Sequence, residues 1–214
     1  AGNSFMGKGT ESTAHYRDTS VHHLDMGNIH RVRAAFMKAH ELFSKSRVPA
    51  DFWRVFNDSN WLHHVSQLLR GGAACSDTLH RRRRSVLVHC SDGWDRTFQV
   101  VSLTKLLLDP HYRSIDGLAA LLELDCCAFG HKCADRLGLS LEGAQSQEWS
   151  PILILLLDAI WQVMRQHSSA FEYTPAALRF IADHAFAGIC DTFLHNSDAE
   201  RRGESERDSV WTLL

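Results

Sequence analysis

Apolar positions recur every three or four residues over much of the chain, and short polar stretches separate these runs. This spacing predicts a helix near residues 28–45. A second helix is expected to begin after Asp58 or Ser59, either of which can cap it. It is expected to end at Gly71-Gly72, because glycine is frequent just past helix ends. The pattern therefore favours a chain rich in amphipathic helices.

A different pattern occupies the middle of the chain, where a short apolar run precedes a polar turn. Ser85 to His89 predict a brief strand, and Thr97 to Leu108 predict a helix that Asp109-Pro110 ends. Further helices are predicted near residues 115–128, after Ser150-Pro151 and from Thr174-Pro175. A strand that leads directly into a helix indicates an α/β element within a mainly helical chain.

Composition and charge narrow the class of protein. The 214 residues, 44% of them apolar and 22% charged, suffice for one ordinary globular core. The longest apolar run, from Ile152 to Trp161, is interrupted by Asp158 and falls short of the roughly 20 residues of a membrane helix. A formal net charge of -2 gives no overall attraction to nucleic acid or to an anionic membrane. Any anion must therefore be bound by a local arrangement of donors.

The six cysteines point to a reducing compartment. Two of them, Cys126 and Cys127, are adjacent, and no apolar stretch of the secretory type lies before them, so a disulfide framework is not expected. Together with His131 and Cys133 they raise the question of a zinc site. Structural zinc sites, however, normally use paired short spacings from two segments. We therefore expect a cytoplasmic protein with no bound metal.

The turn between the predicted strand and the next helix carries the candidate chemistry. Its sequence, HCSDGWDRT at residues 89–97, sets Cys90 six positions before Arg96. A tight turn into a helix aims backbone N–H groups and the positive end of the helix dipole at one concavity, which suits phosphate. These donors would lower the pKa of the Cys90 thiol, and the planar Arg96 side chain could hold two phosphoryl oxygens. Gly93 allows the tight turn, and Thr97 can bond the sulfur or cap the helix.

The cysteine-to-arginine spacing alone is equally compatible with a buried structural thiol, because it often arises by chance. The full string at residues 89–97 resembles the active-site loop of the myotubularin family of phosphoinositide 3-phosphatases without a mismatch. Other segments match that family in the same order: NSFMGKGTES at residues 3–12, Asn28-Ile29-His30 with Arg33, Trp61-Leu62, LLLDPHYR at residues 106–113, FGHKCADR at residues 129–136, Ser150-Pro151 and Phe171-Glu172. The resemblance covers essentially the whole chain.

The resemblance implies removal of the 3-phosphate from phosphatidylinositol 3-phosphate and phosphatidylinositol 3,5-bisphosphate through a cysteinyl-phosphate intermediate, with no metal or other cofactor. Cys90 is then the nucleophile and Arg96 stabilises the transition state. Asp95 protonates the leaving inositol oxygen and later activates water. The other loop residues are assigned to substrate binding: Ser91, Asp92, Gly93 and Trp94. For Asp92, a purely turn-stabilising role is the alternative.

Four residues outside the loop complete the substrate-binding set that the resemblance implies. Asn3 and Asn28 match positions whose amides contact the substrate or support the loop, although either alone would more often be a turn residue or a helix cap. Lys132 and Arg136, four residues apart at a helix start, could meet a second phosphate of the inositol ring. A solvated basic face is the alternative for this pair.

The same resemblance implies an α/β fold of the cysteine-dependent, protein-tyrosine-phosphatase-like class, with a small central sheet flanked by many helices. Residues 1–214 would be a partial phosphatase domain that lacks its N-terminal strands, with no N-terminal lipid-binding domain in this chain. A sheet that lacks strands would expose an unpaired edge. A homo- or heterodimer with another myotubularin-like chain is therefore one expectation.

Two other functions stay open on the sequence. The loop chemistry selects a phosphate and not its carrier, so a phosphatase for phosphotyrosine or another phosphoester is one alternative. A noncatalytic phosphoinositide-binding scaffold, or the partner of an active relative, is the other, and the intact Cys90, Asp95 and Arg96 argue against it. The lipid-phosphatase interpretation places the protein in the cytoplasm, peripheral to endosomal or other phosphoinositide-bearing membranes. It gives no role to nucleic acid.

Overall fold

The computed structural model describes residues 14, 16–45, 47–140, 146–201 and 207–214. Its α-helices are α2 (Ile29–Phe43), α3 (Phe52–Asp58), α4 (Trp61–His80), α5 (Arg96–Leu108), α6 (Ile115–Leu121), α7 (Cys133–Leu137), α8 (Ile152–Gln166), α9 (Pro175–Ala187) and α10 (Asp198–Arg201). Shorter helical segments are η2 (Pro110–Arg113), the π-helical η3 (Leu122–Ala128), η5 (Ser168–Ala170), η6 (Asp191–Phe193) and η7 (Val210–Thr212).

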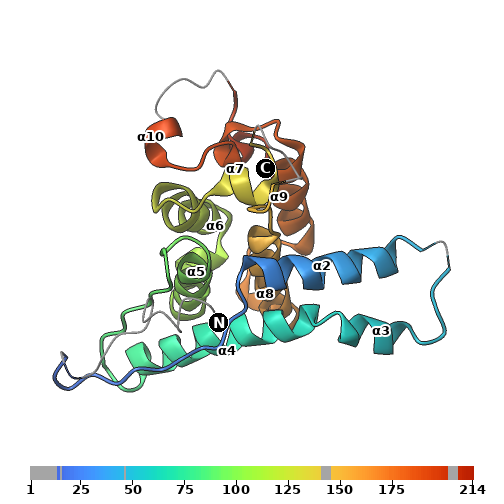
Figure 1. Cartoon of the computed structure of the whole chain (residues 1–214). Coiled ribbons are helices and arrows are strands. Elements are labelled where there is room, and N and C mark those ends of the chain that lie inside the picture. Colours follow the sequence, from blue (N-terminus) through green and yellow to red (C-terminus); the bar gives the residue numbers. More distant parts are fainter. Residues whose placement is uncertain (1–13, 15, 46, 141–145, 202–206) are drawn as a thin grey trace.

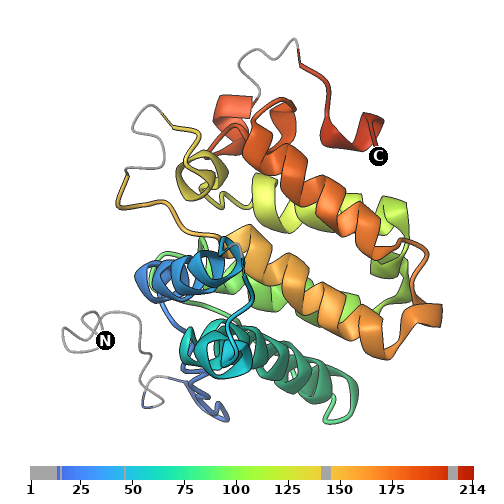
Figure 2. The same cartoon turned by 90° about the vertical axis from the view of Figure 1, so that its right-hand side faces the viewer.

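The core lies where the long helices meet. The helix α4 packs against α5 and α8, and α8 also packs against α9, beside which it runs in Figure 2. Leucines at these contacts are fully buried, among them Leu68 of α4, Leu103 of α5 and Leu156 of α8. Full burial of such a side chain contributes about 1.5–3 kcal/mol. The helical layer is therefore the platform from which the loop before α5 projects (Figure 1).

Several helix starts confirm the sequence pattern. The helix α2 begins directly after Asn28, whose side chain accepts a hydrogen bond from the backbone N–H of Arg31. The predicted helix after the cysteine-bearing turn is α5, and the one predicted from Thr174-Pro175 is α9. The helix after Ser150-Pro151 is α8. The start of α2 has a capping side chain and the start of α9 has a proline at its first position, which is why the pattern locates these two.

The predicted end of the second helix at Gly71-Gly72 is wrong, because α4 continues through both glycines to His80. The reason lies in the packing against α5. A Cβ atom on Gly72 would come within 2.9 Å of the Leu103 side chain, so glycine here permits close approach of the two helices. The glycine pair is a packing feature and does not end the helix.

The strand predicted at Ser85–His89 is also wrong. The segment between α4 and α5 is not helical, but it pairs with no neighbour, and the part of the chain that the structure describes contains no strand. A strand is stabilised by hydrogen bonds to an adjacent strand, and an apolar run cannot supply that partner by itself. Leu87, in the middle of the run, is 84% exposed. The expected central sheet is therefore not seen among the described residues.

The helix predicted near residues 115–128 divides into two segments of different geometry. Its first half is α6, and its second half is the wider π-helical η3. π-Helical turns are rare and occur frequently at functional sites.

Among the described residues, no helix combines the length and the apolar character that a bilayer span requires.

Candidate active site

The sulfur of Cys90 lies at the centre of a tight loop that leads into α5. It accepts hydrogen bonds from the backbone N–H of Gly93 at 3.3 Å and from the hydroxyl of Thr97 at 3.2 Å. Gly93 has a φ of +81°, in the left-handed region that glycine adopts without strain. The loop therefore turns its donors back onto the cysteine, as the sequence predicts.

The environment of Cys90 favours the thiolate. Its partial burial alone would raise the pKa of the thiol. The Thr97 hydroxyl and the backbone N–H groups of Asp92, Gly93 and Thr97 outweigh this effect, so the pKa of Cys90 is lowered below its usual value. A thiolate is the reactive form of cysteine, and a lowered pKa increases its population at neutral pH.

The open face of the loop carries the predicted phosphate-binding groups. Arg96 is the first residue of α5, and its Nη2 lies 3.4 Å from the hydroxyl oxygen of Ser91. Ser91, Asp92 and Gly93 are exposed, whereas Cys90 is half-buried. The loop thus presents a cation and backbone donors to solvent around a partly sheltered sulfur, an arrangement suited to a phosphate group.

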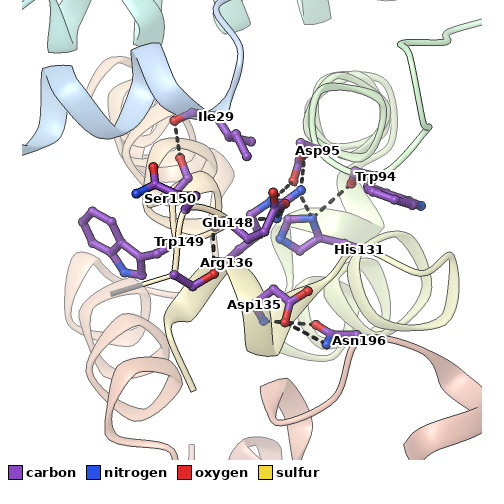
Figure 3. A network of polar contacts seen from close by, with 12 residues as sticks. Ile29, Trp94, Asp95, His131, Asp135, Arg136, Glu148, Trp149, Ser150 and Asn196 are labelled. Carbon is purple, nitrogen blue, oxygen red and sulfur yellow. Dashed lines mark hydrogen bonds and ion pairs between the residues drawn. The ribbon is translucent and has the colours of Figure 1, made fainter. Parts of the chain in front are cut away.

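The side chain of Asp95 points toward Arg136 of α7 (Figure 3). Its two carboxylate oxygens accept hydrogen bonds from Arg136, from Nε to Oδ1 at 2.8 Å and from Nη2 to Oδ2 at 3.0 Å. Arg136 also donates through Nη1 to the Glu148 carboxylate at 2.9 Å and to the Glu148 carbonyl oxygen at 3.1 Å. Burial would raise the pKa of Asp95, but hydrogen bonds and charges from His131 and Arg136 lower it to about 2.

His131 supports the same end of the loop. Its ring is 2% exposed, and Nδ1 lies 3.0 Å from the carbonyl oxygen of Trp94 and 3.2 Å from Oδ1 of Asp95 (Figure 3). The ring also lies beside that of Phe98, with 4.5 Å between the centroids. From the sequence, His131 was considered as a ligand only for a zinc site, which was not expected. Its position within FGHKCADR, a segment that resembles the family, was the signal for a role near the loop.

The two predicted cations of the second-phosphate site occupy different environments. Lys132 is partly exposed, and its Nζ lies 4.1 Å from the centroid of the Trp94 ring. Arg136 is 3% exposed and already engaged with Asp95 and Glu148. Glu148 was missed on the sequence, because it lies twelve positions from Arg136 in a segment without a helical pattern. Of the pair, only Lys132 stands at the surface of the site.

The structure describes only one of the two asparagines that the sequence assigns to substrate binding. Asn28 caps α2, accepting a hydrogen bond from the Arg31 N–H at 3.1 Å, which is the structural role that the sequence left open for it. Asn3 lies outside the described residues. A substrate contact of either residue stays a prediction.

The loop and the helix that follows it bring together a cysteine of lowered pKa and an arginine side chain. Residues 1–202 match the family model of the myotubularin-like phosphatase domain. The chain therefore belongs to the myotubularin-like phosphatase family.

Curated relatives match nearly the whole chain. The chain is 36% identical over 215 residues to phosphatidylinositol-3,5-bisphosphate 3-phosphatase MTMR4 of Mus musculus, a match that covers 99% of this chain and 18% of the relative. The same figures hold for MTMR4 of Homo sapiens. With phosphatidylinositol-3,5-bisphosphate 3-phosphatase MTMR6 of Caenorhabditis elegans the identity is 38% over 217 residues, covering 99% of this chain and 32% of the relative. The chain thus spans less than a third of the length of these relatives.

Proposed function

We propose that this chain carries the catalytic loop of a phosphoinositide 3-phosphatase, which removes the 3-phosphate of phosphatidylinositol 3-phosphate and phosphatidylinositol 3,5-bisphosphate. The observation that carries the proposal is the sulfur of Cys90, which accepts hydrogen bonds from Thr97 and Gly93 beside the guanidinium-bearing start of α5. The relatives supply the substrate class, since they are named as phosphatidylinositol-3,5-bisphosphate 3-phosphatases.

The first chemical step forms a bond between Cys90 Sγ and the phosphorus atom, while the bond from phosphorus to the inositol 3-oxygen breaks. The electron pair of that bond stays on the inositol oxygen, which takes up a proton. Arg96 stabilises the charge on the phosphoryl oxygens during transfer. In the second step, a water oxygen attacks phosphorus and releases inorganic phosphate, and Cys90 returns as the thiolate. No metal or cofactor takes part.

The two proton transfers need carboxyl groups in opposite states. The sequence assigns both transfers to Asp95, whose pKa of about 2 leaves it ionised at neutral pH. An ionised carboxylate is a poor donor to the inositol oxygen, and both oxygens of Asp95 accept hydrogen bonds from Arg136. Asp92 is exposed in the same loop. On position, we therefore assign leaving-group protonation to Asp92, and to Asp95 the role of fixing the loop.

The substrate lipid places the protein at a membrane surface. In this proposal the chain acts in the cytoplasm, peripheral to endosomal or other membranes that contain phosphoinositides, and it pairs with a second myotubularin-like chain. Both parts can be tested directly. Sedimentation with vesicles that contain phosphatidylinositol 3-phosphate reports the association, and light scattering reports the oligomeric state.

Phosphate release tests the proposal against its rivals. Short-chain phosphatidylinositol 3-phosphate, the 3,5-bisphosphate and a phosphotyrosine peptide are offered in parallel to this chain and to its Cys90→Ser variant. We expect release from both lipids, little release from the peptide, and no turnover by Cys90→Ser. The Cys75→Ala variant, which removes a buried thiol of α4 outside the loop, is the matched control and should keep its activity.

Other outcomes identify the alternatives. Faster release from the peptide than from either lipid would make the chain a phosphotyrosine phosphatase. Binding of the lipids with no release by the folded chain would support the noncatalytic scaffold. Release by Cys90→Ser at the rate of the parent chain would remove the cysteine from the mechanism, because a serine hydroxyl without an activating base is a far weaker nucleophile.

A further inference from the structure

Three cysteines that the proposed reaction does not use lie close together. Cys126 and Cys127 belong to the π-helical η3, and Cys133 is the first residue of α7. Their exposed fractions are 0%, 3% and 2%. The three sulfur atoms lie within 4.8 Å of one another, and those of Cys126 and Cys133 are 3.5 Å apart. The fold thus brings three thiols from two segments together at one buried point.

These separations match three ligand positions around one ion. Bonds of about 2.3 Å from a zinc-like ion to three thiolates set the sulfurs about 4 Å apart. Small rotations of the cysteine side chains bring sulfurs that already lie within 4.8 Å to that spacing. On the sequence, the spacing of these cysteines argued against zinc. That argument required two separate paired spacings, whereas the turn between η3 and α7 brings Cys133 back onto Cys126.

We propose that Cys126, Cys127 and Cys133 bind one thiophilic closed-shell cation, Zn²⁺ or Cu⁺. Soft thiolate ligands select these metals over harder cations such as Mg²⁺ or Ca²⁺. His131 does not join the set, since its Nδ1 faces Trp94 and Asp95. The site is separate from Cys90 and its phosphate-binding loop.

The charge of the bound complex depends on the ion. Each thiol that binds releases its proton to the solvent, so three thiolates around Zn²⁺ leave one net negative charge, and around Cu⁺ two. Arg201 is near enough to act electrostatically on Cys127 and Cys133. Its guanidinium, which also pairs with Glu123, offsets part of this charge. Arg201 is thus a cation that reduces the electrostatic cost of an anionic complex at this site.

The position of the site suggests what the ion does. Bound to both segments, it would fix the end of η3 to the start of α7. The residue before Cys133 is Lys132, which lies over the Trp94 ring, and the residue three positions after it is Arg136, which holds Asp95. The ion is thus expected to stabilise the backbone that positions these two cations, without touching the substrate.

Metal binding is tested in the full chain with Cys90→Ser, a substitution that removes the reactive thiol as a competing ligand. All thiols are kept reduced with a phosphine. Cd²⁺ is the spectroscopic probe, because thiolate-to-cadmium charge transfer gives an ultraviolet band that free thiols lack. We expect one equivalent of Cd²⁺ to bind, a large excess of Zn²⁺ to compete with it, and the melting temperature to rise with either ion. A parallel titration with Cu⁺ under anaerobic conditions shows which ion binds more tightly.

Variants locate the site. Cys126→Ala and Cys133→Ser in the Cys90→Ser background should lose the band and the rise in melting temperature. Cys75→Ala and Cys190→Ala, which remove buried thiols outside the cluster, should keep both. Circular dichroism of each variant establishes that it is folded.

Two results would overturn the proposal. One is a reduced, folded parent chain that gives no band and no rise in melting temperature with Cd²⁺, Zn²⁺ or Cu⁺. The other is a band of equal size in the Cys126→Ala and Cys133→Ser variants, which would mean that the ion binds elsewhere.

Discussion

Arg136 and Asp95 form a two-point ion pair that joins α7 to the loop before α5. The guanidinium donates from Nε and Nη2 to the two carboxylate oxygens, at 2.8 and 3.0 Å, and the arginine is 3% exposed. The residues are 41 positions apart in the sequence. Because Asp95 directly precedes α5, the pair fixes the end of the loop that carries Cys90 and Arg96.

Substitution of Arg136 should therefore destabilise the folded chain strongly. Removing one partner of a buried ion pair leaves the other charge without compensation, which typically costs about 3–5 kcal/mol. We expect Arg136→Ala to lower the free energy of unfolding by an amount of this order, as measured by urea unfolding. Arg136→Lys should recover only part of the loss, since an ammonium cannot reproduce the planar fork.

An exposed pair on α9 provides the control. Arg179 and Asp183 are 3.8 Å apart and their side chains are 85% and 70% exposed, so Arg179→Ala should change stability by less than about 1 kcal/mol. If the two alanine variants destabilise the chain equally, the pair of Arg136 and Asp95 is not a structural brace.

Low pH should remove the contribution of Asp95 to the stability of the folded chain. The folded-state pKa of this carboxyl lies near 2, below its usual value of 3.8. The stabilisation is therefore fully present above pH 4 and is lost as the pH falls toward 2. It amounts to roughly 2 kcal/mol. Compared with the parent chain, Asp95→Asn should be less stable at pH 6, and the difference should shrink below pH 4. A difference that is constant from pH 6 to pH 2.5 would contradict the assigned pKa.

The local part of this site was visible in the sequence. The contacts of Cys90 with Gly93 and Thr97 lie within one turn, so the order of residue types along HCSDGWDRT was enough to predict them. The same holds for the start of α2, which the neighbouring Asn28 caps.

The long-range part was not visible. Whether Arg136 faces a ring phosphate or Asp95 depends on how α7 packs against the loop, and spacing within one segment carries no such information. The two wrong predictions about secondary structure have the same origin. Gly72 continues a helix because Leu103 packs against it, and the run around Leu87 forms no strand because no described segment pairs with it. Each outcome is decided by a partner far away in the sequence.

Substitutions of the two loop aspartates should have different effects when the leaving group of the substrate is changed. An aryl phosphate with an acidic phenol needs no proton for departure, whereas an inositol alkoxide does. We expect Asp92→Asn to slow lipid hydrolysis by about 10²- to 10⁴-fold and to leave cleavage of the aryl ester nearly unchanged. Asp95→Asn should slow hydrolysis of both substrates alike, because it loosens the loop that holds Cys90 and Arg96 for either substrate. The opposite pattern would return the donor role to Asp95.

The hydroxyl of Thr97 should control the reactivity of Cys90. It donates to Sγ at 3.2 Å and contributes to the lowered pKa of the thiol. In Thr97→Val the hydrogen bond is absent, so the pKa of Cys90 should rise. The pH profile of alkylation by iodoacetamide should then move to higher pH, while Thr97→Ser should keep the profile of the parent chain. An unchanged profile in the valine variant would mean that the backbone donors alone set the thiolate population.

The selectivity for a second ring phosphate should depend on Lys132 more than on Arg136. Lys132 is partly exposed beside the loop, with its ammonium 4.1 Å from the centroid of the Trp94 ring, whereas Arg136 is buried against Asp95. A lost hydrogen bond to a charged group costs about 1.5–3 kcal/mol. Lys132→Gln should therefore lower kcat/KM for the 3,5-bisphosphate by roughly 10- to 150-fold, and for the 3-monophosphate much less. Lys132→Arg should keep most of the activity on both lipids. Arg136→Lys should lower kcat/KM for both substrates by the same factor, because Arg136 acts through the position of Asp95. Equal losses on the two lipids in Lys132→Gln would show instead that the ammonium serves only to hold the Trp94 ring.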